Sequence, residues 1–328
     1  MRYGTVQAMW LVVACTPGIV SAMAQPILND GEMLRRLEQG PKGMLAIKAI
    51  QGTAGGPAVT GDEVEIVLFH RDAPIKQLTG RLDDQGVLML GDIPVAIGIT
   101  PLVRIRHAGV QYQDAAPTMT PEKPNAQAQI TVYEVTDEVP AWHGTMRHMV
   151  VEKRDGGMVV SETVVVENSG DKTWLGAPPD AQQRRATVSF ELPQGASDVE
   201  LVQGFHGWCC STFATPTLTV QMPLMPGKMT YKFAYRVPIV GGAGDLRVRM
   251  PVSVGRLAMF VPREGTVIEP LGTVESTANS NGSAMRMFQA DALTPATLAG
   301  LRLRFGTAPA LQASALKPGS WSKLSERS

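Results

Sequence analysis

The chain has 328 residues, with Lys plus Arg and Asp plus Glu equal at 30 each, so its formal net charge at pH 7 is zero. A chain without net charge has no overall field to attract nucleic acid or an anionic membrane surface, so charge indicates neither as a partner. The length favours two domains, and 33 Gly with 24 Pro among 44% hydrophobic residues is typical of short strands joined by tight turns.

Residues 1–24 are predicted to be an export signal. Arg2 precedes an apolar stretch over residues 8–14, and Ala22 and Ala24 supply the small residues that a signal peptidase requires. Cleavage after Ala24 would release an exported protein into the periplasm or the extracellular space.

A second interpretation of the same segment is a lipoprotein signal. The run Val12-Val13-Ala14-Cys15 resembles a bacterial lipobox, which would leave Cys15 as a lipid-modified first residue. No later stretch approaches the roughly 20 apolar residues of a membrane span, so no transmembrane span is expected. The chain is therefore predicted to be soluble after export, or tethered only at its start.

Residues 25–43 are predicted to form a short helical N-terminal segment. Over residues 29–39, an Asn-Asp cap is followed by apolar residues at helical spacing, and Gly40-Pro41 ends the pattern. This is the single helix that we expect after the signal.

A first β-sandwich is predicted over residues 44–137. From Met44 the apolar period becomes two, and turn signals recur about every ten residues, as in all-β sandwiches. The expected strands lie at residues 45–50, 63–69, 76–82, 87–90, 103–107, 109–112 and 128–135. Residues 136–142, which contain Pro140, are the expected linker.

Several short motifs in this region follow one another in a recognisable order. They are Gly61-Asp62-Glu63-Val64, Asp83-Asp84-Gln85-Gly86-Val87-Leu88, Ile93-Pro94, Val103-Arg104-Ile105 and Gly109-Val110-Gln111-Tyr112. Over residues 44–135 this order resembles the carboxypeptidase regulatory-like modules, which are small prealbumin-like (transthyretin-like) β-sandwiches attached to many exported bacterial proteins. The resemblance implies a folding, docking or carbohydrate-contacting domain without catalytic residues. The longer connection over residues 96–102 departs from that pattern.

A second β-sandwich, transthyretin-like or immunoglobulin-like, is predicted over residues 142–306. It begins with a hairpin whose Asp155-Gly156 turn is a strong hairpin signal. The expected strands lie at residues 147–152, 158–168, 186–192, 218–222, 229–237, 246–250 and 257–261. Residues 307–328 are small, polar and interrupted by Pro and Gly, so we expect a disordered tail.

Two turns of this second region add a looser resemblance. Asn168-Ser169-Gly170-Asp171 and Leu192-Pro193-Gln194-Gly195-Ala196 resemble turns of the sandwich that accompanies such modules in uncharacterised exported proteins. This resemblance implies an architecture and no activity. The predicted fold class is therefore all-β, with two β-sandwich domains after a signal peptide.

The chain lacks the sequence signatures of common enzymes. It contains no Gly-x-Ser-x-Gly elbow, His-Glu-x-x-His helix, phosphate-binding Gly-x-x-x-x-Gly-Lys-Ser/Thr loop or dinucleotide fingerprint. We therefore expect a protein that is not an enzyme and needs no cofactor. The absence of motifs leaves open the hypothesis of an enzyme whose catalytic site is assembled from residues far apart in the sequence.

The most unusual stretch is Phe205-His206-Gly207-Trp208-Cys209-Cys210. One interpretation is a buried or turn-located thiol pair packed with Trp208, because free Cys behaves as a small apolar residue. A second is a vicinal disulfide that stiffens a loop or responds to redox conditions. A third is a soft-metal site with His206, Cys209 and Cys210 as ligands of copper or zinc. Two adjacent cysteines do not complete a tetrahedral site alone.

Two other groups of polar residues resemble ligand sets more weakly. The run Trp142–Met149 contains two His and two Met, which suit copper, but 17 Met occur along the chain and Met commonly fills core gaps. Asp83, Asp84 and Asp92 lack the spacing of a calcium loop. We interpret the methionines as core residues and the aspartates as turn formers.

The leading hypothesis from the sequence is a non-catalytic envelope protein that docks to a protein partner or an extracellular polysaccharide. Strands and their edges offer a surface for such binding. The alternative hypothesis is a periplasmic protein that handles copper, zinc or redox equivalents through His206, Cys209 and Cys210.

Overall fold

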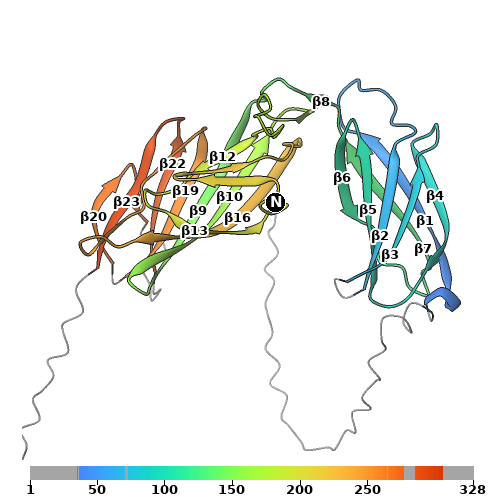
Figure 1. Cartoon of the computed structure of the whole chain (residues 1–328), viewed down its shortest axis with the longest axis horizontal. Helices are drawn as coiled ribbons and strands as arrows, with labels where there is room; N and C mark the ends of the chain where they lie inside the picture. The colour runs from blue at the N-terminus through green and yellow to red at the C-terminus, as the bar shows by residue number, and fades with distance from the viewer. Residues whose placement is uncertain (1–34, 36, 71–72, 264, 277–284, 306–328) are drawn as a thin grey trace, which may run out of the picture.

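A computed structural model of the chain describes residues 35, 37–70, 73–263, 265–276 and 285–305. Strands dominate this part of the chain, which confirms the predicted all-β class (Figure 1). No helix within the described ranges is long and apolar enough to cross a membrane.

Several sequence predictions concern the two ends of the chain. The predicted signal over residues 1–24, with the alternative lipid site Cys15, and the predicted tail over residues 307–328 lie outside the described residues. Of the helix predicted over residues 29–39, the described residues 35 and 37–39 are helical.

The first sandwich is built from seven strands in two sheets, ordered β4-β1-β7 and β3-β2-β5-β6. Their bounds are β1 (Lys42–Gln51), β2 (Glu63–His70), β3 (Ala73–Arg81), β4 (Val87–Pro94), β5 (Ile99–His107), β6 (Val110–Ala115) and β7 (Asn125–Val132). Strand β1 pairs antiparallel with β4 and parallel with β7, so the first and last strands of the sandwich are neighbours.

The core of this sandwich follows the period of two in its strands. Leu45 and Ile47 of β1 and Ile66 and Leu68 of β2 are fully buried. They belong to one apolar cluster that draws on both sheets. Because successive side chains of a strand point to opposite faces, the residues between these positions, Ala46 and Val67, lie on the other face of each strand.

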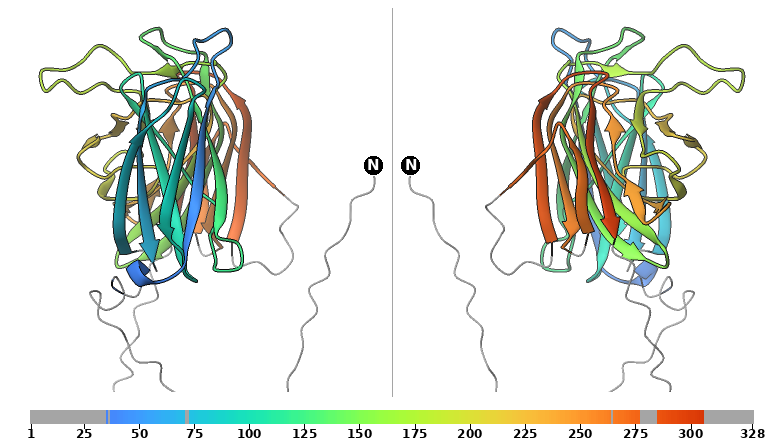
Figure 2. Two further views of the ribbon diagram at one scale, coloured as in Figure 1. Left: turned by 90° about the vertical axis from the view of Figure 1, so that its right-hand side faces the viewer. Right: turned by 90° about the vertical axis from the view of Figure 1, so that its left-hand side faces the viewer.

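A second apolar cluster forms the core of the second sandwich, between residues 149 and 305. Its main sheet has seven strands in the order β13-β16-β10-β9-β19-β22-β21, and smaller sheets complete it with β12-β15-β14 and with β23 paired to β17, β18 and β20. The bounds are β9 (Trp142–Arg154), β10 (Gly157–Asn168), β12 (Val188–Glu191), β13 (Ser197–Gln203), β14 (Ser211–Ala214), β15 (Thr217–Val220), β16 (Gly227–Pro238), β17 (Ala243–Asp245), β18 (Val248–Arg249), β19 (Val254–Pro262), β20 (Gly265–Leu271), β21 (Val274–Glu275), β22 (Met285–Leu293) and β23 (Leu298–Phe305). The end-on views show the two bodies of strands one behind the other (Figure 2).

The structure corrects three strand predictions. Strand β5 begins at Ile99, so residues 99–102 belong to it and not to the connection expected over residues 96–102. The strand expected over residues 246–250 is reduced to β18. The Arg247 backbone N–H donates to the Asp245 carboxylate at 3.0 Å, and such a side-chain bond competes with a ladder bond to β23. The strand expected over residues 128–135 ends at Val132, and the short strand β8 (Val135–Thr136) follows it.

The second core contains a buried ion pair. Arg147 of β9 is 2% exposed, and its Nε donates to Oε1 of Glu162 on β10 at 2.5 Å. The Arg147 Nη2 donates to the Glu191 carbonyl at 2.7 Å. The hydroxyl of Tyr235 on β16 donates to Oε2 of Glu162 at 2.8 Å, so both carboxylate oxygens have a partner. Buried charges are tolerated when they are paired and hydrogen-bonded in this way.

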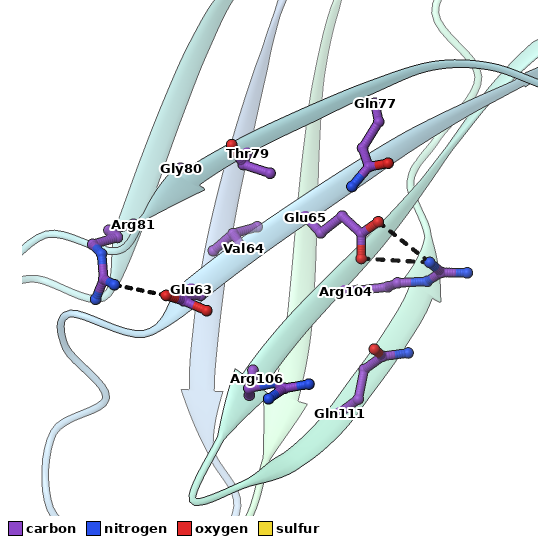
Figure 3. A pocket seen from close by; sticks show the side chains of 10 residues that line it. All are labelled: Glu63, Val64, Glu65, Gln77, Thr79, Gly80, Arg81, Arg104, Arg106 and Gln111. Carbon is purple, nitrogen blue, oxygen red and sulfur yellow. Dashed lines mark hydrogen bonds and ion pairs between the residues drawn. The ribbon is translucent and has the colours of Figure 1, made fainter.

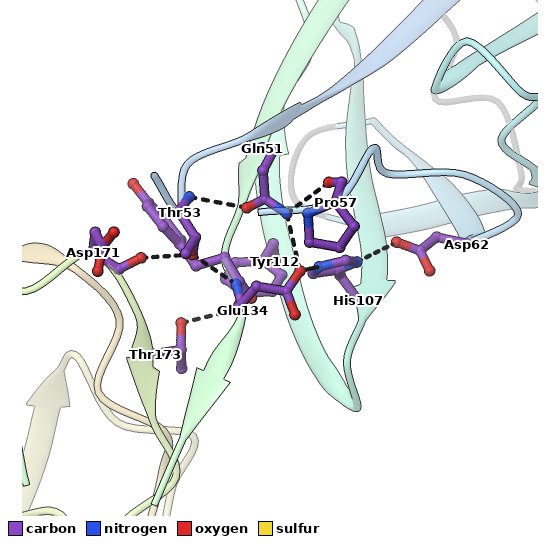
Figure 4. Close-up of polar contacts among 10 residues, drawn as sticks. Gln51, Thr53, Pro57, Asp62, His107, Tyr112, Glu134, Asp171 and Thr173 are labelled. Carbon is purple, nitrogen blue, oxygen red and sulfur yellow. Dashed lines mark hydrogen bonds and ion pairs between the residues drawn. The ribbon is translucent and has the colours of Figure 1, made fainter. Parts of the chain in front are cut away.

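Polar contacts join the two sandwiches where β8 pairs in parallel with β11 (Thr173–Trp174). The Thr53 hydroxyl donates to the Asp171 carbonyl at 2.7 Å and accepts from the Glu134 N–H at 2.9 Å. The hydroxyls of Tyr112 and Thr173 lie 2.8 Å apart. Figure 4 shows this group of contacts, which we call the clamp.

A histidine lies beside the clamp in the first sandwich. The Nδ1 of His107 is 2.6 Å from an Asp62 oxygen, and its Nε2 is 3.1 Å from the Glu134 oxygen to which Gln51 also donates (Figure 4). Carboxylates at both ring nitrogens fix the orientation of the ring. Since Glu134 also contributes its N–H to the clamp, His107 orders the first-sandwich side of the junction.

Candidate functional site

The outer face of the sheet β3-β2-β5-β6 carries a polar hollow of about 540 Å³. We call it the arginine groove (Figure 3). Its polar lining side chains are Glu63, Glu65, Gln77, Thr79, Arg81, Arg104, Arg106 and Gln111. Three arginines against two glutamates leave one positive charge in excess on a chain whose net charge is zero.

The register of the strands brings these residues together. Glu63 of β2 lies opposite Arg81 of β3 on one side and Arg106 of β5 on the other. One step along the same face, Glu65 lies opposite Thr79 and Arg104. Directly opposed residues are close enough for their side chains to interact. The glutamates of β2 are therefore flanked by arginines of the neighbouring strands.

The three arginines of the groove differ in their partners. Arg81 Nη2 is 2.7 Å from Glu63, and both side chains are well exposed. Arg104 Nη1 is 3.4 Å from Glu65, with about a third of each side chain exposed, and the Arg104 Nε is buried without a hydrogen-bond partner among the described residues. Arg106 is exposed and forms no ion pair within the part of the chain described here. Arg106 is therefore the free cation of the groove.

This arrangement suits the binding of a carboxylate-bearing ligand. A guanidinium presents parallel N–H donors that match a carboxylate, and the amides of Gln77 and Gln111 can donate to and accept from hydroxyl groups. Figure 3 shows Gln111 on β6 beside Arg106 on β5, and Gln77 on β3 across β2. The described lining contains no Ser, Cys, His or aromatic side chain. The groove therefore offers charged and amide groups that can recognise a polar ligand.

The structure places His206, Cys209 and Cys210 in the loop between β13 and β14, far along the chain from the groove. The sulfurs of Cys209 and Cys210 are 3.2 Å apart, so both are free thiols. The Cys209 thiol donates to the His206 backbone carbonyl at 3.4 Å, so this contact does not use the imidazole. Among the described residues, no group of three or more His, Cys, Asp or Glu side chains is placed to hold a metal.

The run Trp142–Met149 belongs to β9, so the linker expected over residues 136–142 ends before Trp142. His148 packs edge-on against Phe260, with ring centroids 6.0 Å apart. Burial lowers the pKa of His148, and the charge of Arg256 lowers it further. Met149 is fully buried in the second core. These contacts account for the residues as packing elements.

Of the three aspartates that we interpret as turn formers, Asp83 and Asp84 lie in the turn between β3 and β4, whereas for Asp92 the interpretation is wrong, because it lies within β4. The Asp83 Oδ1 accepts hydrogen bonds from the backbone N–H groups of Gln85 and Val87, at 2.9 and 2.8 Å. This is the side-chain capping that makes Asp frequent in turns. The turn joins β3 to β4 as the sequence predicts.

Sequence reasoning did not identify the arginine groove as a site. The signal available was the repeat of charged residues at every second position, Glu63 with Glu65 and Arg104 with Arg106. Such a repeat indicates one polar face of a strand. That the two charged pairs lie opposite each other depends on the register between β2 and β5, which separate segments of sequence do not specify.

Comparisons with known proteins add little to this geometry. No protein-family profile matches the chain, and no curated protein matches it. Among solved structures, it is similar to the full-length major pilin SpaD from Corynebacterium diphtheriae, at 12% identity over 77% of this chain and 82% of that chain. The TM-score is 0.24, so this likeness carries no argument about fold or function.

Proposed function

We propose that the chain is a non-catalytic, exported binding protein whose arginine groove holds a carboxylate-bearing polysaccharide. The observation that carries the proposal is the exposed Arg106 guanidinium, which lies in the groove without an acceptor among the described residues. A uronate carboxylate would supply acceptors to this guanidinium, and the sugar hydroxyls would meet the groove amides.

The composition of the groove favours a polysaccharide over a protein partner. Protein interfaces usually have a desolvated centre with aromatic or aliphatic anchors. The groove instead presents charged and amide side chains on a rigid sheet. An acidic polysaccharide has a repeating pattern of carboxylates and hydroxyls that such a surface can bind along its length.

We further propose that residues 44–137 are a carboxypeptidase regulatory-like module and residues 142–306 a second sandwich, both following a signal over residues 1–24. The two separate apolar clusters support this division. The order of motifs in the first region supports the module assignment. N-terminal sequencing of exported protein would test cleavage after Ala24 against lipid attachment at Cys15.

The function is tested by calorimetric titration of the purified chain with alginate, a uronate polymer, and with dextran, a neutral one. We expect binding to alginate that weakens with salt, because the contacts are ionic. The variant Arg106→Ala should weaken alginate binding by about tenfold to a hundredfold, since a hydrogen bond to a charged group contributes about 1.5–3 kcal/mol.

Arg304→Ala is the matched control. Arg304 also lies exposed on a strand, in β23, and no ion pair involves it among the described residues. This variant should bind alginate as the unchanged protein does. Equal affinities for alginate in Arg106→Ala and Arg304→Ala, or no alginate binding at all, would refute the proposed function.

A further inference from the structure

The loop that carries the two adjacent cysteines has a fixed position. Phe205 packs against Tyr231 and Phe233 of the second core, with ring centroids 5.2 and 6.1 Å apart. Gly204 has φ of +86°, and a Cβ there would lie 2.3 Å from the Thr230 carbonyl oxygen. The chain can therefore approach β16 closely only with glycine at this position.

The end of the loop is also ordered by backbone bonds. The Cys210 N–H donates to the Gly207 carbonyl at 3.2 Å, and the Gln221 N–H donates to the Cys210 carbonyl at 2.9 Å. Gly207 has φ of +98°, a backbone conformation that favours glycine. The cysteines are consequently held at the surface by a loop that is tied at both ends.

The two sulfurs lie in contact. Their separation is 3.2 Å. A disulfide needs about 2.0 Å, so closure requires the sulfurs to approach by roughly 1 Å. Cys209 is exposed and Cys210 is half-buried. The hydrogen bond with Cys209, followed by burial, raises the pKa of the Cys210 thiol. Cys209 is therefore the accessible attacking group and Cys210 the protected neighbour.

We propose that Cys209 and Cys210 form a dithiol site that a small-molecule disulfide oxidises reversibly to a vicinal disulfide. This site is separate from the arginine groove and does not depend on the proposed function. The inference rests on the contact between the sulfurs, the exposure of one of them and the anchoring of their loop.

The exchange proceeds in two steps. The Cys209 thiolate attacks one sulfur of the small disulfide, whose S–S bond breaks and releases one thiolate with the electron pair. Cys210 then loses its proton to water, and its sulfur attacks Cys209 Sγ and expels the second thiolate. The protein loses two electrons and two protons, and the small disulfide becomes two thiols.

The chain offers a clean readout. No Lys or Arg lies between Arg185 and Lys228, so trypsin releases residues 186–228 as one peptide that contains Cys209 and Cys210 and excludes Cys15. After treatment of the folded chain with glutathione disulfide, we expect this peptide to lose both free thiols and two hydrogen atoms in mass. Dithiothreitol should restore both thiols.

Two variants separate the steps. In Cys210→Ser the second step is blocked, so the peptide should retain one glutathione on Cys209. In Cys209→Ser only the half-buried thiol remains, and glutathione should add more slowly. The emission of Trp208, which is 52% exposed beside the pair, should change on oxidation, and Trp208→Phe should remove that change.

Three results would overturn the proposal. The first is a wild-type peptide that keeps both free thiols after the treatment. The second is a disulfide that joins two chains. The third is one equivalent of copper or zinc on the purified chain that protects both thiols, which would instead assign the pair to a metal site.

Discussion

The buried pair Arg147–Glu162 gives the sharpest test of how the second sandwich is held together. The side chains are 2% and 0% exposed, so removing one partner leaves the other charge in an apolar core. Breaking such a pair costs about 3–5 kcal/mol. We therefore expect Arg147→Met to destabilise the second sandwich by this amount. The free energy of unfolding of a typical domain is only about 5–15 kcal/mol, so the loss is a large share of it.

Removal of the whole network should cost far less. The triple variant Arg147→Met, Glu162→Leu, Tyr235→Phe leaves no buried charge and no phenol without an acceptor. Replacing a buried ion pair by apolar residues of similar volume is often neutral or stabilising. We expect the triple variant to lie close to the unchanged protein and well above Arg147→Met in stability.

The assay is urea denaturation followed by tryptophan fluorescence. None of the five tryptophans of the chain lies within residues 44–137, and Trp142, Trp174 and Trp208 lie in or beside the second sandwich, so a change in fluorescence on unfolding reports the second sandwich. Arg154→Met is the control, because Arg154 lies on the same strand and pairs with Glu152 at the surface, where such pairs contribute about 0–1 kcal/mol. Similar free energies of unfolding for Arg147→Met and Arg154→Met would refute the reasoning, as would an equally large loss in the triple variant.

Three further predictions concern pH, the clamp and a close backbone contact. Burial raises the pKa of Tyr231 and Tyr235 above 10.0. Above pH 10 the unfolded chain loses phenol protons that the folded chain keeps, so the stability that these tyrosines contribute is fully present below pH 10 and is lost as the pH rises. Denaturation between pH 8 and about 11 should show a decline of up to about 1.4 kcal/mol per pH unit for each tyrosine, which Tyr235→Phe reduces; a flat profile would contradict this. Thr53→Val removes the hydroxyl shared by the two sandwiches and should cost about 1–3 kcal/mol, seen as faster proteolysis between the sandwiches, while unchanged proteolysis would argue against the clamp. Gly43→Ala places a Cβ 1.7 Å from a backbone oxygen and should cost about 1–3 kcal/mol by calorimetry, whereas Gly91→Ala, with nothing within 4 Å, should change little; equal effects would show that the backbone yields at Gly43.

The sequence predicts most of the strands because their burial alternates. Strands with one buried face show a period of two, and this signal locates β2, β5 and the β9–β10 hairpin. Strand β13 was not predicted, because it lies at a sheet edge and most of its side chains are exposed, so no alternation marks it. Strand β14 has four residues whose burial does not alternate, whereas the equally short β12 and β15 alternate and overlap predicted strands.

The candidate sites show a different limit. Cys209 and Cys210 stand out in the sequence because adjacent cysteines are rare, yet the contact of their sulfurs and their unequal exposure follow from the fold of the loop. The arginine groove is the opposite case, since none of its residues is unusual alone. Arg106 is left without an ion-pair partner among the described residues, because its cross-strand neighbour Glu63 is paired to Arg81.

The parallel pairing of β1 with β7 has a consequence for the order in which the chain can fold. Met44 of β1 pairs with Asn125 of β7, so β1, the central strand of its sheet, completes its pairing only with residues about 80 positions later in the chain. Contacts so distant in sequence form late and slowly, because a long loop must close first. Until β7 arrives, the edge of β1 is open to pairing with another chain. A chain in which β7 has not yet paired is therefore open to aggregation through β1.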